Sequence, residues 1–114
     1  MAGLRTLVDS DGDNSAQACK TSNGRLYGVE VSNPNSADAY LQLFDLATGS
    51  VTVGTTTPKL SFLVPAGNGT IDGAYDDYWT DGIEFNVAIT YACTTGVATS
   101  GDPTTGLIVN MMYR

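Results

Sequence analysis

Alternation of apolar and polar residues is the sequence feature that most limits the folds open to this chain. In residues 83–91 (IEFNVAITY) every second residue is large and apolar, so these side chains would share one face of an extended strand. Residues 25–32, 60–64 and 107–113 repeat this period of two, and we expect Tyr27, Val29 and Val31 to face inward with Leu26 outward. No stretch of ten residues shows a helical period free of Gly or β-branched residues. The pattern predicts an all-β protein.

The strand count favours two packed sheets over one. Turn sequences rich in Gly, Pro, Asn and Ser separate about seven expected strands at the spacing typical of all-β domains. Residues 39–44 are apolar on both faces apart from Gln42, so this strand should lie centrally or under a contact. We therefore predict an antiparallel β-sandwich, jelly-roll-like in its connections.

The chain length suits one domain with a distinct start. With 114 residues there is room for a single core. We assign residues 16–114 to the sandwich and residues 1–15 to an N-terminal arm or edge strand followed by an acidic loop. Residues 4–8 would form this short strand, and residues 9–15 would be flexible.

The charge balance argues against two classes of partner. The formal net charge is −7, with only five Lys and Arg, so phosphate backbones and anionic lipid surfaces are poor partners. No apolar run approaches the roughly 20 residues of a membrane span. The first residues lack the basic head and apolar core of a signal peptide, so we expect either that the chain is made and used without export or that its processed form is shown.

The absence of histidine argues against catalysis. Without His the chain lacks the commonest general base and the commonest catalytic metal ligand, and no glycine fingerprint for a nucleotide cofactor is present. A carboxylate pair drawn from Asp76, Asp77, Asp81 and Glu84 is the remaining catalytic option, and chance spacing explains it as well. We predict a protein that is not an enzyme and holds no cofactor.

Three aspartates pose the question of a calcium site. Asp9, Asp11 and Asp13 have the spacing of a calcium loop, but Asn14 stands where such a loop needs Gly and Lys20 where it needs Glu. A solvated acidic loop is the favoured interpretation, and we predict no metal.

The two cysteines leave two alternatives open. Cys19 and Cys93 could form a bridge that closes a long loop, or they could be two small buried apolar residues.

An aromatic segment and an apolar segment are the candidate contact sites. Residues 74–81 (AYDDYWTD) place Tyr75, Tyr78 and Trp79 among carboxylates, which predicts a Gly-flanked loop typical of interface hot spots or of sugar-stacking platforms. Alternatively, Trp79 or Tyr78 plugs one end of the sandwich. In the N-terminal segment the candidate contacts are Leu4, Leu7 and Val8.

Several strand-and-turn segments together resemble a known kind of protein. Residues 24–33 (GRLYGVEVSN), 39–45, 53–58, 62–65 and 107–114 are similar to small β-sandwich virion proteins of tailed bacteriophages, most of all head decoration (cement) proteins. The resemblance spans about residues 16–114 and concerns strand patterns, not a catalytic signature.

The resemblance implies a role on the surface of a phage capsid. Such proteins fold in the host cytoplasm and are commonly homotrimers that bridge neighbouring major capsid subunits and stabilise the head. Some relatives belong to tails or fibres, so the alternative is a module that binds host-surface glycan through Tyr75, Tyr78 and Trp79. For the capsid role, pairing of an edge strand or arm with a neighbour would supply main-chain hydrogen bonds.

Overall fold

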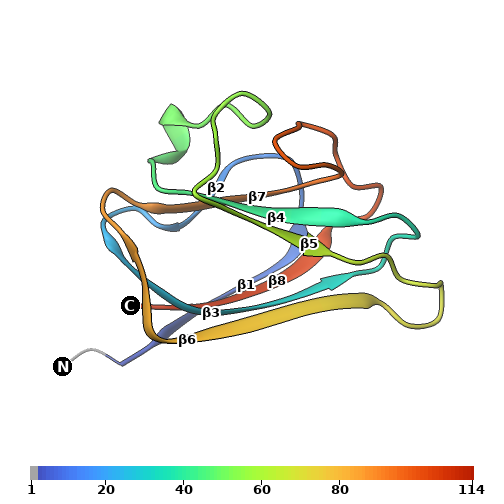
Figure 1. Cartoon of the computed structure of the whole chain (residues 1–114), viewed down its shortest axis with the longest axis horizontal. Coiled ribbons are helices and arrows are strands. Elements are labelled where there is room, and N and C mark those ends of the chain that lie inside the picture. The colour runs from blue at the N-terminus through green and yellow to red at the C-terminus, as the bar shows by residue number, and fades with distance from the viewer. Residues whose placement is uncertain (1–2) are drawn as a thin grey trace.

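Two four-stranded antiparallel sheets pack face to face in the computed structural model, which describes residues 3–114 (Figure 1). Sheet A has the order β1-β8-β3-β6 and sheet B the order β2-β7-β4-β5. The strands of sheet A are β1 (Arg5–Gly12), β8 (Leu107–Tyr113), β3 (Gly24–Asn33) and β6 (Gly73–Phe85). Those of sheet B are β2 (Gln17–Lys20), β7 (Ile89–Thr94), β4 (Ala39–Phe44) and β5 (Leu60–Val64), and one 3-10 turn, η1 (Thr48–Ser50), follows β4. The fold is an antiparallel β-sandwich, as predicted, with eight strands in place of seven.

The order of the strands is that of a jelly roll. Apart from β4 to β5, each successive strand crosses to the other sheet, and every paired neighbour runs antiparallel. The connections therefore gather at two opposite ends. One end holds the loops β1–β2, β3–β4, β5–β6 and β7–β8, and the other holds the loops β2–β3, β4–β5 and β6–β7 with the start of β1 and the end of β8 (Figure 1).

The core fills the space between the sheets. Alternate residues of β8 are buried, as the period of two predicts, whereas β4 is buried at five of its six residues. Leu60 and Phe62 of β5 pack against this core. Core side chains from seven strands are joined by Leu7 of β1, so β1 is part of the packed body. No helix among residues 3–114 has the length and apolar character needed to cross a bilayer.

One strand has its inner face shifted by a bulge. The pairing of β3 with β6 and β8 slips between Leu26 and Gly28. The slip turns Leu26 into the core, where it is fully buried, and leaves Tyr27 half-buried outside, beside Gly82 with its φ of +75°. The expected inward Tyr27 and outward Leu26 were therefore wrong, while Val29 and Val31 do face the core.

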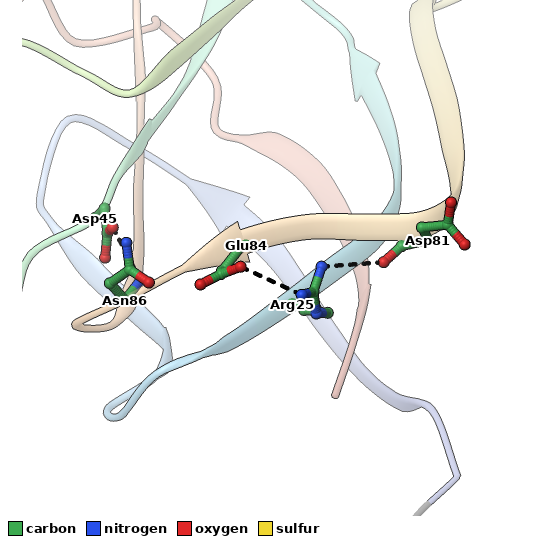
Figure 2. Close-up of polar contacts among 5 residues, drawn as sticks. All are labelled: Arg25, Asp45, Asp81, Glu84 and Asn86. Carbon is green, nitrogen blue, oxygen red and sulfur yellow. Dashed lines mark hydrogen bonds and ion pairs between the residues drawn. The ribbon is translucent and has the colours of Figure 1, made fainter.

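The longest alternating segment is two strands, not one. Residues 86–88 form the turn between β6 and β7, so the chain changes sheets within the predicted strand 83–91. The carboxylate of Asp45 accepts hydrogen bonds from the N–H groups of Asn86 (2.9 Å) and Val87 (2.8 Å), with Ala88 at 3.4 Å (Figure 2). This turn leaves Val87 exposed while Phe85 and Ile89 stay buried.

The outer face of sheet B is covered by the chain's own loops. Gln42, Thr90 and Thr94 are polar residues of its two central strands, and all three are fully buried. The β4–β5 and β7–β8 loops lie above this face (Figure 1). Side chains hold the loops down, since Thr90 donates to the Leu46 carbonyl at 2.6 Å and Thr94 to the Gly96 carbonyl at 2.8 Å. The prediction that residues 39–44 lie centrally or under a contact is confirmed, because β4 is a central strand of sheet B.

Candidate partner interface on the outer face of sheet A

The outer face of sheet A is open, in contrast to that of sheet B. The strand register places Val8, Asn110, Glu30 and Asp76 side by side in one row across the sheet. The next row contains Thr6, Met112, Gly28 and Tyr78. Val8 is 68% exposed, Tyr78 56% and Ile108 39%, so apolar side chains from three strands face solvent here. We call this surface, with Ile108 beyond the first row, the sheet A face.

A glycine shapes the centre of the sheet A face. A Cβ atom on Gly28 would lie 2.7 Å from the ring of Tyr78 and 2.9 Å from the terminal methyl of Met112. Only a residue without a side chain leaves room for both groups to lie across β3. Tyr78 and Met112 therefore form a shallow apolar centre over the middle strand.

The hydroxyl of Tyr78 is fixed to its neighbour. It donates a short hydrogen bond to the carboxylate of Glu30, which is also on the sheet A face. This bond, with some desolvation and the nearby negative charges, raises the pKa of Tyr78 to about 12. Tyr78 therefore stays a neutral donor at physiological pH, and its ring is held along the surface.

The aromatic segment is an edge strand, not the predicted loop. Residues 74–81 lie within β6, where alternation sends Tyr75 and Trp79 inward and Tyr78 outward. The rings of Tyr75 and Trp79 stack on Phe62 of β5, with centroids 5.0 Å and 5.9 Å apart. The three aromatic residues therefore do not lie on one face, and the glycan-platform geometry expected of them is not formed.

The N-terminal candidates also separate into two groups. Leu7 points inward and packs against the core, whereas Val8 belongs to the sheet A face. Leu4 precedes β1 and is 52% exposed. Of the predicted arm, residues 5–12 form the edge strand β1 paired with β8, and Met1 and Ala2 lie outside the described residues.

The expected acidic loop is mostly strand. Asp9 and Asp11 belong to β1, which ends at Gly12 after an irregularity in its register. Asp9 accepts a 2.7 Å hydrogen bond from the Tyr91 hydroxyl, and burial together with this bond raises the pKa of Tyr91 above its usual range. Asp13 instead accepts from the N–H of Ser15 at 2.9 Å. Within residues 3–114 no three acidic or cysteine side chains gather in a way that could hold a metal ion.

The acidic residues of β6 that were candidates for a catalytic pair differ in their positions and in their contacts. Asp76 lies on the sheet A face, and Asp77 accepts from the Tyr75 hydroxyl at 3.2 Å. Glu84 pairs with Arg25 at 3.2 Å, and Arg25 also donates to the carbonyl of Asp81 (Figure 2). The four predicted candidates therefore differ in their contacts: the carboxylates of Asp77 and Glu84 have side-chain partners, Asp81 contributes its backbone carbonyl, and Asp76 lies on the sheet A face.

Both cysteines are free thiols in the structure. Cys19 and Cys93 are buried in the core, and burial raises the pKa of each to about 12. They occupy the positions of small apolar residues.

Comparison of the sequence with known proteins found no relative. No protein-family model and no curated protein matches the chain. The residues that sequence reasoning missed are Gly28, Ile108 and Met112 of the sheet A face. The alternation in residues 107–113 already placed Ile108 and Met112 outward, but nothing in the sequence indicated which sheet would be left uncovered.

Proposed function

We propose that this protein decorates the head of a tailed phage, where it binds neighbouring major capsid subunits as a homotrimer and stabilises the shell. The observation that supports this role most is the difference between the two outer faces. The two central strands of sheet B are covered by the chain's own loops, and only Leu63 of the edge strand β5 is an exposed large apolar residue among its described strands. The sheet A face leaves Val8, Ile108 and Tyr78 exposed on three strands. An exposed apolar surface on a small protein is typical of an interaction site.

The composition of the sheet A face suits a protein partner. Tyr and Met are enriched in the centres of protein interfaces, and Tyr78 and Met112 meet over Gly28 at the centre here. Of the two carboxylates in the row beside this centre, that of Glu30 is already hydrogen-bonded by Tyr78. The desolvation of this face on binding is therefore less costly than for free carboxylates.

The edges of sheet A offer a second kind of contact. β1 and β6 are its outermost strands, and β6 spans 13 residues. A partner strand added at such an edge would form main-chain hydrogen bonds, while alternate side chains would select the partner. Jelly rolls also build many viral capsid domains, an analogy of fold that agrees with a virion role.

A charge placed on the sheet A face tests the proposal. In the double variant Val8→Asp/Ile108→Asp, two carboxylates would enter the contact without touching the core. We expect affinity for purified heads that lack the protein to fall about 100-fold, since each ~1.4 kcal/mol of desolvation costs tenfold in binding. Cosedimentation with the heads measures this affinity.

The matched control places two carboxylates on another surface. Ile71→Asp/Val97→Asp alters residues of the β5–β6 and β7–β8 loops that are 69% and 54% exposed. We expect this variant to bind heads as the natural protein does. Natural affinity in Val8→Asp/Ile108→Asp, with an unchanged melting temperature, would refute the sheet A face as the binding surface.

A further inference from the structure

The positive charges of this acidic protein gather at one end of the sandwich. All five Lys and Arg lie at the end that holds the β2–β3, β4–β5 and β6–β7 loops. Arg5 is the first residue of β1, and Arg114 directly follows β8. Lys20 closes β2, Arg25 is the second residue of β3, and Lys59 directly precedes β5. We call this end the basic end.

Backbone pairing holds these cations near one another. Arg5 stands opposite Tyr113, and the main chains of Arg25 and Arg114 exchange two hydrogen bonds of 2.9 Å. A pocket of about 580 Å³ is lined by Arg5, Lys20 and Arg114, together with hydroxyl-bearing residues of the β2–β3 loop. The basic end is therefore a concave surface with three cationic side chains around it.

Few carboxylates neutralise the basic end. In the part of the chain that the structure describes, the one ion pair joins Arg25 to Glu84 at 3.2 Å (Figure 2). Asp45 lies near Lys59 but is engaged by the N–H groups of the β6–β7 turn. Within residues 3–114 no carboxylate pairs with Arg5, Lys20 or Arg114. The Lys20 ammonium donates to the Asn23 carbonyl and the Arg114 guanidinium lies over the Tyr27 ring, and neither contact neutralises the positive charge.

The opposite end carries only negative charge among its ionisable side chains. Five carboxylates lie in or beside its loops: Asp11, Asp13, Asp38, Asp72 and Asp102. The loops are tied together, since Asn14 donates to Asp102 and to the Ser100 carbonyl, and Asn35 bonds to Thr105 in both directions. This acidic end is thus a fixed surface.

The distance between the ends preserves the contrast. The molecule is 42 Å long, and its strands run along this length (Figure 1). At about 0.1 M salt charges are screened beyond roughly 10 Å, so the two ends act on neighbours independently. The formal net charge of −7 therefore does not show that the two ends of the molecule carry charges of opposite sign.

We propose that the basic end binds the acidic end of a second copy of this chain. The two surfaces are complementary in charge and present on every molecule, so the contact is heterologous and runs head to tail. Such a contact closes into a ring or continues as a chain of molecules. It leaves the sheet A face uncovered and does not depend on capsid binding.

Charge reversal at either end, tested without capsids, examines this contact. One variant, Arg5→Glu/Arg114→Glu, reverses the basic end, and another, Asp11→Lys/Asp72→Lys, reverses the acidic end. All four residues are exposed, and both variants remain net negative because each changes the formal charge of −7 by four units. Sedimentation velocity reports association of each variant alone and of their equimolar mixture.

We expect the natural protein to associate at about 10 mM salt and to weaken at least tenfold at about 1 M, as the screening length falls from about 30 Å to about 3 Å. Each variant alone should stay monomeric, and the mixture should associate again, because each supplies the end that the other has lost. Monomers in the natural protein at low salt, or a mixture no more associated than its components, would overturn the proposal. Association that persists unchanged in both variants would also overturn it. Stabilisation by inorganic phosphate without association would assign the basic end to a small anion instead.

Discussion

Replacing Asp45 should reveal how strongly one carboxylate holds the β6–β7 turn. Two good hydrogen bonds, to the N–H groups of Asn86 and Val87, are lost in Asp45→Ala. Charged hydrogen bonds contribute about 1.5–3 kcal/mol each, but both N–H groups lie in exposed residues that water can reach. We therefore expect a loss of about 2 kcal/mol in the free energy of unfolding. For a domain of this size the melting temperature should fall by about 8 °C.

The pH dependence separates charge from hydrogen bonding at this turn. Burial works to raise the pKa of Asp45, but the N–H donors of residues 86–88 and the charge of Lys59 outweigh it and leave the pKa below its ordinary value. The stabilisation is therefore complete above the unfolded pKa of about 4, and it is lost as the pH falls through the lower folded pKa. Asp45→Asn keeps an acceptor oxygen without the charge, so it should lose about half as much stability and show no such dependence.

Chemical denaturation of the three proteins at pH 7 and at about pH 2.5 measures these differences. Asp72→Ala, which removes an exposed carboxylate from the β5–β6 loop, is the control and should stay within about 0.5 kcal/mol of the natural protein. Equal stability of Asp45→Ala and the natural protein at pH 7 would refute the account of the turn. So would a difference that persists in full at pH 2.5.

Three further predictions concern the core and its edges. Trp79→Ala should lower the free energy of unfolding by about 3 kcal/mol, because its ring packs on Phe62, while Tyr78→Ala should cost under about 1 kcal/mol; urea titration distinguishes them. Gly12→Ala would bring a methyl group within 2.9 Å of the Cys93 sulfur and 3.1 Å of a backbone oxygen, so thermal melting should show a loss of about 1–3 kcal/mol. Cys19 and Cys93, with pKa values raised to about 12, should react with a thiol reagent at neutral pH only when urea unfolds the chain; rapid labelling of the native protein would contradict their burial.

The sequence predicted those parts of the fold that depend on one strand alone. Alternation in residues 107–113 identified the buried face of β8, and the apolar character of residues 39–44 predicted a covered central strand. It failed at Leu26, where a bulge that depends on the partner strands reverses the faces. It failed again at residues 86–88, since the turn is fixed by Asp45, about 40 positions away along the chain.

The candidate site could be predicted only residue by residue. Val8 and Tyr78 were recognised as possible contacts, but their place on one sheet face follows from pairing across β8 and β3. Tyr75 and Trp79 were misassigned because Gly73 and Gly82 indicated a loop where the chain forms an edge strand. Whether a face is open depends on where distant loops fold back, which no local pattern contains.

Because two loops cover the central strands of sheet B, the loops of this protein should differ in how well they tolerate an inserted peptide. Insertions into the β4–β5 or β7–β8 loop would displace the loops that cover Gln42 and Thr94 and would expose the two central strands to solvent. The β5–β6 loop covers no strand in this way, and its tip closes on itself through Asn68, which accepts from the N–H groups of Thr70 and Ile71. At that tip Gly69 faces open space with a φ of +86°. We therefore expect that a peptide or an affinity tag inserted between residues 68 and 70 would leave the packing of the two sheets unchanged.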